Sequence, residues 1–445
     1  MARRVRAARP ARSRGRHTGH LPGPAARRAL QQGAAADLAA RPRRRPRHRH
    51  RHRTESPPAM TVTREDIFPA SEFEQRRQRV RGAMRARKLD AIVLHDPSNI
   101  YYLCGHHTLN IWDYQCLVLP LDGTPFMLLW QFEQGRFNAS ATACEAVYFG
   151  NGADPVAATA ETLAARGLGR TRIGLEAGGN FLNAARHAAL VDALPAARFA
   201  DASGLVEDAR AVKSPAEIDV MRQAQNVTDA TMRAALAAIR PGANDREITG
   251  AMADALIAGG TQGFSIFPMV AVGARSGVPH HAQIGATVAL GDTVFLECSP
   301  ALHWYHAPLM RTAVLGAPRD PFVEEVAAVG TEAIEAMMQA MKPGVRACEV
   351  AEAGARIVDR IRDDILFHDF YGYSVGIGFP PTWIAGGSMQ ITRDNTRPLE
   401  AGMTFHFPMT LRRLGVFGVG QSRTVVVTET GCEALSALPL GLDRL

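Results

Sequence analysis

Several side chains in the second half of the chain are of types that can transfer protons or bind charged groups. Glu297 ends the apolar stretch Thr293-Val-Phe-Leu, and burial there would raise its pKa and suit it to base work near neutrality. His280 follows Pro279 in a predicted turn, and His306 lies in the aromatic stretch Trp304-Tyr-His-Ala. An imidazole can transfer protons, and a guanidinium such as that of Arg311 can hold a carboxylate.

Charge is distributed unevenly along the 445 residues. Residues 1–59 hold 17 Arg and no Lys against only Asp37 and Glu55, a net charge of +15, whereas residues 60–445 carry −7. A nucleic-acid footprint is a basic patch on a folded domain, so the overall charge of +8 does not predict one. No window predicts a transmembrane helix, and six scattered Cys favour reduced thiols in a cytoplasmic protein.

Residues 1–59 contain almost no bulky apolar residue, so we expect a disordered Arg-rich tail without a core. A nucleic-acid arm, a nuclear signal and a transit peptide are all Arg-rich. A transit peptide is also Ser-rich, and the tail has only Ser13 and Ser56. We favour the interpretation that the tail is translated upstream sequence and that the protein starts at Met60.

Two domains are expected after the tail. Strands alternate with helices over residues 60–198, which predicts an α/β layer domain with a turn at Asp96-Pro-Ser-Asn. The second domain, 199–445, has the helix start Ser214-Pro-Ala-Glu217. Ser214 is a good N-cap there, and Glu217 would complete a capping box.

The second domain contains an internal repeat. Ile239-Arg-Pro-Gly matches Met341-Lys-Pro-Gly, and the similarity continues at a constant offset of 102 residues. Each copy predicts a helix, a Pro-Gly break and a new helix, because Pro cannot continue a helix and Gly tolerates a positive φ. Two such halves facing each other would enclose a central cleft.

The order of these motifs resembles the creatinase, prolidase and aminopeptidase P family. Leu89-Asp-Ala-Ile-Val followed by Asp96-Pro-Ser-Asn-Ile-Tyr-Tyr-Leu-Cys-Gly is similar to its amino-terminal domain, and Ser214-Pro-Ala-Glu-Ile is similar to the join between its domains. The resemblance covers residues 72–443. It implies an α/β (α+β) fold class, with a creatinase-like amino-terminal domain and a pita-bread domain of two related αβ halves.

Peptidases of this family hold two divalent ions with two Asp, one His and two Glu. The corresponding positions here are Glu297, Pro308, Tyr373, Pro408 and Ser422. One carboxylate, one phenol, one hydroxyl and two prolines can neither complete the coordination shells nor neutralise the charge of two such ions. We therefore expect no metal and no cofactor, and the loss of the metal-hydroxide mechanism.

The residues that remain resemble the metal-free branch of the family, which includes ectoine hydrolase and creatine amidinohydrolase. The stretches that carry this resemblance are Phe295-Leu-Glu-Cys-Ser, Tyr305-His-Ala, Leu309-Met-Arg-Thr, Gly372-Tyr-Ser-Val-Gly and Gly402-Met-Thr-Phe-His. The branch implies hydrolysis of a C–N bond in a small polar compound, such as a cyclic or guanidino compound. Thr382-Trp-Ile-Ala departs from the expected Asp-Trp-Gly-Glu, which leaves the substrate open.

The resemblance implies roles for these side chains. Glu297 would activate water or attack the substrate carbon, His280 would carry a proton to the leaving nitrogen, and Tyr373 would stabilise the developing charge. The expected substrate-binding residues, which stabilise charge or hold a carboxylate, are His306, Arg311, His406 and Arg423.

Each of these roles has a structural alternative. Glu297 could be a buried acid satisfied by backbone groups, His280 a turn residue, Tyr373 a packing residue and Arg311 an ion-pair partner. Three functions remain open: a metal-free C–N hydrolase, a metal-dependent Xaa-Pro peptidase with unusual ligands, and a binding protein that lost catalysis. The retained polar set favours the first. We expect a small-molecule substrate and a homodimer, with neither nucleic acid nor a membrane as partner.

Overall fold

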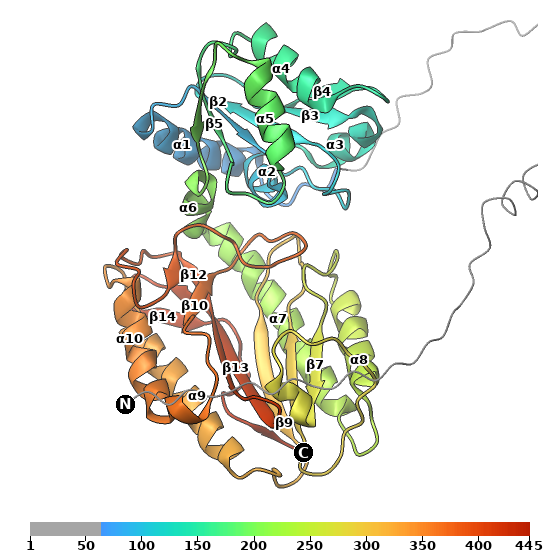
Figure 1. Ribbon diagram of the computed structural model, residues 1–445, viewed down its shortest axis with the longest axis vertical. Coiled ribbons are helices and arrows are strands. Elements are labelled where there is room, and N and C mark those ends of the chain that lie inside the picture. The colour runs from blue at the N-terminus through green and yellow to red at the C-terminus, as the bar shows by residue number, and fades with distance from the viewer. Residues whose placement is uncertain (1–63) are drawn as a thin grey trace, which may run out of the picture. The chain divides into compact units, whose positions relative to one another are not determined.

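The computed structural model describes residues 64–445, so the Arg-rich tail and the expected start at Met60 lie outside the described residues. Among the described helices, none is both long and apolar enough to cross a membrane. The described residues form three sheets and the helices that cover them (Figure 1).

The first sheet has the strand order β4-β3-β2-β1-β5-β6. It is mixed, since β2 runs antiparallel to β1 and β3, and the other pairs are parallel. Its strands are β1 (Ala91–Leu94), β2 (Cys116–Pro120), β3 (Phe126–Trp130), β4 (Glu145–Phe149), β5 (Arg172–Leu175) and β6 (Arg198–Asp201). The predicted boundary between residues 198 and 199 falls inside β6, which still pairs with β5.

Six helices accompany this sheet and its exit. They are α1 (Ala70–Ala86), α2 (Pro97–Cys104), α3 (Gln134–Ser140), α4 (Pro155–Ala165), α5 (Ala184–Ala193) and α6 (Leu205–Ala211), with a short 3-10 turn at Gln131–Glu133. The predicted turn at Asp96 is the start of α2. Asp96 Oδ1 accepts a hydrogen bond from Ser98 N at 2.7 Å, and Gly105 ends the helix at a φ of 73°.

The repeat seen in the sequence is present as two helix pairs. The first pair is α7 (Pro215–Ala238) and α8 (Asp245–Ala258), and the second is α9 (Phe322–Ala340) and α10 (Ala347–Val358). Gly242 and Gly344 occupy the breaks with φ values of 83° and 85°. Each donates its N–H to a carbonyl 2.9 Å away, that of Val288 and that of Leu399. The capping box at the start of α7 is also present, between Ser214 and Glu217.

Two sheets follow these helices. The four-stranded sheet has the order β15-β9-β8-β7, with β7 (Met269–Val272), β8 (Thr293–Cys298), β9 (Leu309–Val314) and β15 (Asp443–Arg444). The five-stranded sheet has the order β11-β10-β12-β13-β14, with β10 (Gly372–Ser374), β11 (Gln390–Ile391), β12 (Thr404–Arg413), β13 (Phe417–Val427) and β14 (Cys432–Ala434). Two 3-10 segments, Gly273–Gly277 and Asp359–Asp364, complete the elements.

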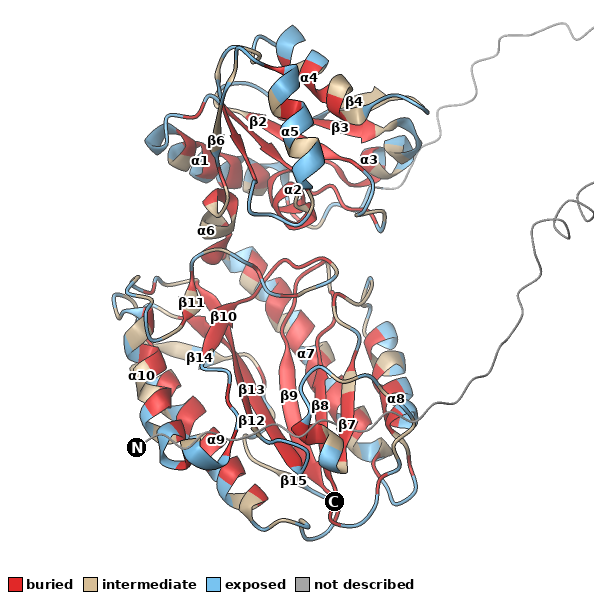
Figure 2. Ribbon diagram, in the orientation of Figure 1, coloured by how far each residue is buried: buried red, intermediate tan, exposed pale blue. Residues whose placement is uncertain are grey.

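The two sheets adjoin where β9 lies beside β13. Ser422 Oγ accepts a hydrogen bond from Met310 N at 2.7 Å, and Thr312 Oγ1 bonds both the N–H and the carbonyl of Gly420. Figure 2 shows these central strands as buried. Their side chains alternate between two faces with a period of two, so one face packs on the helices and the other is free to form a site.

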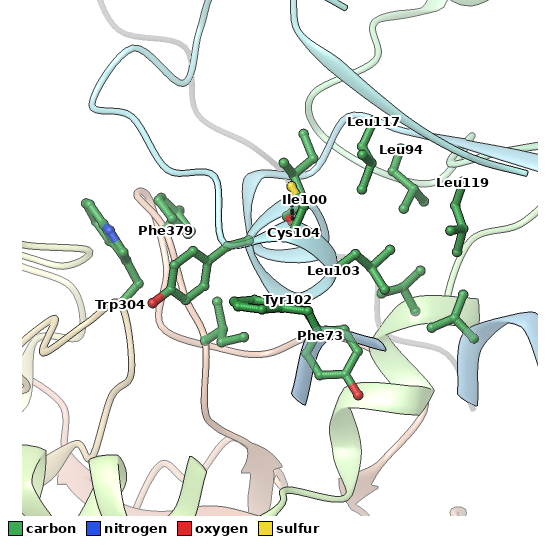
Figure 3. Packing of buried hydrophobic residues seen from close by; sticks show 14 of the residues in the cluster. Phe73, Leu94, Ile100, Tyr102, Leu103, Cys104, Leu117, Leu119, Trp304 and Phe379 are labelled. Atoms are coloured by element: carbon green, nitrogen blue, oxygen red, sulfur yellow. Dashed lines mark hydrogen bonds between the residues drawn. The ribbon is translucent and has the colours of Figure 1, made fainter. Parts of the chain in front are cut away.

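A shared apolar core joins the first sheet to the loops after β8 and β10. Figure 3 shows Trp304 and Phe379 beside the α2 side chains Ile100 and Tyr102. The rings of Trp304 and Phe379 stack with their centroids 4.1 Å apart. The first 140 described residues and the rest of the described chain therefore share buried apolar surface and belong to one compact unit.

Candidate active site

A cavity of about 600 Å³ lies on the free face of the adjoining sheets. Most of its wall is apolar and comes from β7, β8, β9, β10, β12, the 3-10 segment Gly273–Gly277 and four loops. Its lining residues are Ile266, Met269, Ser276, Val278, Pro279, His280, His281, Phe295, Glu297, Met310, Leu366, His368, Phe370, Tyr373, Pro381, Trp383, Ile384, Pro408, Thr410 and Arg412.

Strand register decides which side chains reach this cavity. On β8, Phe295 and Glu297 face the cavity, and Glu297 pairs across the sheet with Met310, which faces it too. On β12 the alternate residues from Pro408 to Arg412 line the cavity, while Phe407, Met409 and Leu411 pack in the core beneath α9. Tyr373 of β10 pairs with His406 of β12 on that same cavity face.

Glu297 is the acid of the cavity, as expected from its place at the end of an apolar strand. Its side chain is buried, and burial raises its pKa to about 8, while the nearby Arg412 guanidinium acts in the opposite direction. A carboxyl group with such a pKa is largely protonated at neutral pH and becomes available as a base as the pH approaches 8. Within the described residues, no hydrogen bond is formed by this carboxyl group, which lines the cavity.

Tyr373 forms a short buried network beside Glu297. Its hydroxyl oxygen accepts a hydrogen bond from Trp383 Nε1 at 2.9 Å and lies 2.7 Å from His406 Nδ1. Burial and the neighbouring Glu297 raise the pKa of Tyr373. Burial lowers the pKa of His406 to about 3, and His406 Nε2 has no hydrogen-bond partner among residues 64–445. His406 therefore acts on the cavity through Tyr373.

The two adjacent histidines in the loop before β8 both line the cavity, and their contacts differ. His281 Nε2 lies 2.9 Å from the carbonyl of Val270 and so is tied to β7. His280 is exposed, forms no hydrogen bond within the described residues, and has a φ of 52°. A non-glycine residue in that region of φ is uncommon, and at His280 it leaves the imidazole available to a ligand.

His306 and the two predicted arginines do not line the cavity. His306 is buried behind Trp383, where its Nε2 contacts Ser265 Oγ at 3.0 Å and the Gly378 carbonyl at 2.9 Å, and burial lowers its pKa to about 4. Its contacts support the loop that carries Trp383. A direct contact with a substrate in the cavity is not available to it.

Strand alternation explains the position of both arginines. Arg311 pairs with Leu296, one residue before Glu297, so it points to the opposite face and forms an ion pair with Asp443 at 2.6 Å. Arg423 pairs with Phe407, which belongs to the core face of β12, and donates to the Leu438 carbonyl at 2.5 Å. Arg311 is thus an ion-pair partner, the structural alternative given for it above, and neither arginine reaches the cavity.

Two cavity residues with ionisable side chains, Arg412 and His368, were not singled out from the sequence. His368 Nδ1 accepts a hydrogen bond from Phe370 N at 3.1 Å, so its Nε2 donates to Thr410 Oγ1, also at 3.1 Å. Burial, with the nearby Arg412, lowers its pKa to about 4. Arg412 could have been found by continuing the period-two pattern of β12 past His406. His368 carries no comparable signal.

The residues present do not fit the dinuclear metal site of the peptidases that the sequence resembles. Glu297, Tyr373 and Pro408 do lie together at the cavity, and Ser422 Oγ is taken by Met310 N. One carboxylate and one phenol remain as donors. Within residues 64–445, no three His, Cys, Asp or Glu side chains are placed to share an ion. The donor chemistry is thus too poor for two divalent cations.

Comparison with known proteins identifies the family. Residues 76–212 match the creatinase/prolidase N-terminal domain, and residues 219–429 match metallopeptidase family M24. Ectoine hydrolase of Halomonas elongata is 30% identical over 393 residues, covering 84% of this chain and 97% of that protein. An uncharacterized hydrolase/peptidase of Sinorhizobium fredii, y4tM, is 29% identical over 386 residues, covering 84% and 97%.

Solved structures show the same fold. The Xaa-Pro dipeptidase from Bacillus anthracis superposes with a TM-score of 0.73 at 22% identity, covering 84% of this chain and all of that one, 100%. The prolidase from Thermococcus sibiricus gives a TM-score of 0.75 at 19% identity, covering 84% and 99%. The sequence matches confirm the predicted family, and the solved structures confirm the predicted α/β fold class. The chain therefore belongs to metallopeptidase family M24 and is, like its named relatives, a hydrolase acting on C–N bonds.

Proposed function

We propose that this chain is a metal-independent hydrolase that cleaves a C–N bond in a small polar compound, of the same type as ectoine hydrolase. The observation that carries the proposal is Glu297, a buried carboxyl group with a pKa raised to about 8, facing a mostly apolar cavity of about 600 Å³. A cavity of this size suits a small molecule. The 30% identity to ectoine hydrolase over almost its full length supports a cyclic amidine as substrate class.

Glu297 supplies the chemistry that starts the reaction. In its ionised form it takes a proton from water, and the water oxygen forms a bond to the amidine or amide carbon. The alternative is direct attack of the carboxylate on that carbon, followed by hydrolysis of the covalent intermediate. Both routes end with the C–N bond broken and its electron pair on nitrogen. His280, the exposed imidazole at the mouth, delivers the proton that this nitrogen takes up.

The Tyr373 network supports a role for the phenol as hydrogen-bond donor. A buried N–H without a partner costs more than a partnerless lone pair. The solitary Nε2 of His406 is therefore the unprotonated nitrogen, and Nδ1–H donates to Tyr373. Tyr373 then accepts two hydrogen bonds, from His406 and Trp383, and its own proton is free to point into the cavity. A donor there stabilises negative charge that develops on the substrate.

The proposal is tested with the purified full-length chain against ectoine, creatine, other cyclic amidines and Xaa-Pro dipeptides. Each compound is assayed with a chelator and with added Mn²⁺ or Co²⁺. We expect hydrolysis of a compound from the first three groups, with a rate that the chelator and the metals leave unchanged. Glu297→Gln should lower kcat by about a hundredfold or more, as expected for loss of a general base. Glu429→Gln removes an exposed carboxylate and serves as the matched control.

Other outcomes separate the alternatives. Stoichiometric bound metal together with activity lost on chelation would contradict the proposal and favour an Xaa-Pro peptidase with unusual ligands. Tight binding of a compound without turnover would favour a binding protein. Retained activity in Glu297→Gln, with the fold intact by circular dichroism, would remove Glu297 from the mechanism.

A further inference from the structure

Arg412 carries a positive charge at the cavity without an anionic partner. Its Nε is buried and has no hydrogen-bond partner, and within residues 64–445 no carboxylate forms an ion pair with it. The other arginines nearby differ, because Arg311 pairs with Asp443 and Arg413 pairs with Asp320. Arg412 as a whole is half-buried, and a guanidinium that lines a cavity without an ion pair to the described residues is suited to bind an anion that enters the cavity.

The chain holds this guanidinium in one place. The backbone of Arg412 exchanges two hydrogen bonds with Leu366, at 2.6 and 3.1 Å, which fixes the end of β12 to the loop after α10. The guanidinium lies over the ring of Phe295, with its central carbon 5.4 Å from the ring centroid. An arginine that stacks on an aromatic ring keeps its N–H groups in a plane and ready for a bidentate acceptor.

The neighbouring polar groups cannot neutralise Arg412. His368 offers no free acceptor, because its Nδ1 accepts from Phe370 N and its Nε2 donates to Thr410. His280 has no carboxylate with which to pair Arg412. Glu297 is the one acid that lines the cavity within the described residues, and with a pKa of about 8 it is largely protonated at neutral pH. Within the described residues, no acid that lines the cavity forms an ion pair with Arg412.

We propose that Arg412 is the anion-binding residue of the cavity and that it holds a carboxylate of the substrate while the scissile C–N carbon faces Glu297. This inference rests on the proposed function and narrows its substrate class to compounds with a carboxylate and a separate amidine or guanidine group. Such a zwitterion matches the cavity, since its carboxylate pairs with Arg412 and its cationic end, placed beside Glu297, favours the ionised form of that carboxyl group. Arg412 then has the role that the sequence suggested for Arg311 or Arg423.

The test compares three variants of the full chain, Arg412→Gln, Arg412→Lys and the matched control Arg413→Gln. Binding of ectoine and creatine, and of their neutral carboxamide analogues, is measured by calorimetry, and turnover is measured in parallel. We expect Arg412→Gln to weaken binding of the carboxylates and to raise their KM at least tenfold, with a smaller change in kcat. The affinity for the carboxamides should be the same in Arg412→Gln as in the unmodified chain. Arg412→Lys keeps the charge without the planar fork and should lie between, while Arg413→Gln should match the unmodified protein.

The outcomes separate this inference from the proposed function. Carboxylate binding that depends on Arg412 without any hydrolysis supports the anion site and counts against the hydrolase. Hydrolysis with the same KM in Arg412→Gln overturns the anion site and leaves the hydrolase standing. Equal affinity for carboxylates and carboxamides, or no carboxylate binding to the unmodified chain, also overturns it. If Arg412→Gln unfolds, the Arg412→Lys comparison decides.

Discussion

Two opposing effects act on the pKa of Glu297. Burial in an apolar wall raises it, and the positive charge of Arg412 lowers it. Burial is the larger effect and raises its pKa to about 8. If Glu297 must be ionised to act, kcat/KM should rise about tenfold per pH unit below pH 8 and level off above it. A pH profile of kcat/KM on the best substrate measures this. A profile that is flat between pH 6 and 9, on a step shown to be chemical, would contradict the role of Glu297 as base or nucleophile.

The same raised pKa makes the contribution of Glu297 to the free energy of unfolding depend on pH. In the unfolded chain the carboxyl group has a pKa near 4.5, and in the folded chain it has a pKa of about 8. The folded protein therefore holds the proton more tightly, so the free energy of unfolding falls as pH rises from 4.5 to 8. Above pH 8 the loss is complete, on the order of a few kcal/mol.

Replacement of Glu297 by Gln should therefore stabilise the protein at high pH. We expect Glu297→Gln to raise Tm relative to the unmodified chain at pH 9, with little difference at pH 4.5, because Gln resembles the protonated acid. Thermal unfolding at both pH values measures this, and Glu429→Gln, the same substitution at an exposed residue, is the control. An equal Tm difference at the two pH values would show that Glu297 does not titrate between them.

Strand β12 shows how far sequence reasoning reaches at the scale of one element. The motif around His406 placed the right strand at the cleft, and alternation from that residue gives Pro408, Thr410 and Arg412 on the same face. Arg311 and Arg423 were chosen for their residue type and their motif, and one-residue offsets in register put them on the opposite faces of β9 and β13. A single step in a strand reverses the face.

Other parts of the site lie beyond local patterns. Whether Trp383 and His406 meet on one phenol depends on how a loop folds over β10, and no spacing in the sequence encodes that contact. The resemblance supplied Glu297, His280 and Tyr373 because their motifs keep the order of the family. The helix pairs were predictable because the Pro-Gly breaks repeat, and Gly242 and Gly344 share the left-handed conformation that such breaks require.

Strand β13 supports the anion site through a glycine. A Cβ added at Gly420 would clash with Phe295 Cε2, so the ring on which Arg412 stacks would have to move. Gly420→Ala should lower the free energy of unfolding by about 1–3 kcal/mol, as overpacking does, and should raise KM for a carboxylate substrate. Gly250→Ala, in α8 where no atom lies within 4 Å, is the matched control and should be neutral or slightly stabilising. Chemical denaturation of both variants measures this, and equal stabilities would contradict the close contact.

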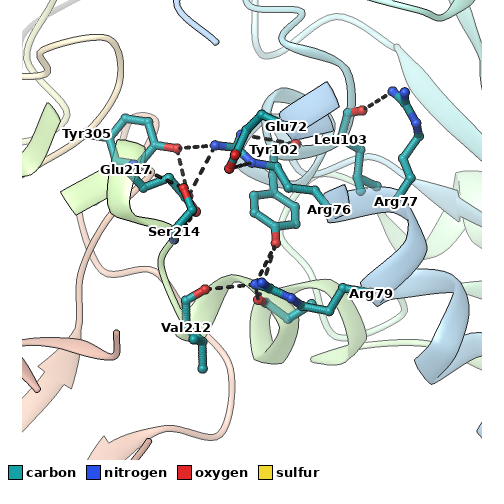
Figure 4. A network of polar contacts seen from close by, with 11 residues as sticks. Glu72, Arg76, Arg77, Arg79, Tyr102, Leu103, Val212, Ser214, Glu217 and Tyr305 are labelled. Carbon is teal, nitrogen blue, oxygen red and sulfur yellow. Dashed lines mark hydrogen bonds and ion pairs between the residues drawn. The ribbon is translucent and has the colours of Figure 1, made fainter. Parts of the chain in front are cut away.

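At the scale of the whole described chain, a buried polar network ties α1 to the start of α7 (Figure 4). Arg76 lies 3.3 Å from the Tyr305 hydroxyl and 3.7 Å from Glu217 Oε1, and Tyr305 donates to Glu217 at 2.8 Å. Glu217 is the same residue that closes the capping box of α7. Tyr305 directly precedes His306, which supports the loop carrying Trp383. The network therefore links the amino-terminal sheet to one wall of the cavity.

Removal of Arg76 should expose this coupling. Arg76→Met leaves Glu217 buried without its cation, a loss that typically costs about 3–5 kcal/mol. We expect a lower Tm. Because the two parts lose a shared contact, we also expect separate unfolding transitions by calorimetry, against a single expected transition for the unmodified chain. Arg85→Met removes an exposed arginine from the same helix and should change neither. A single transition at an unchanged Tm in Arg76→Met would mean that the apolar core around Trp304 and Phe379 alone joins the two parts.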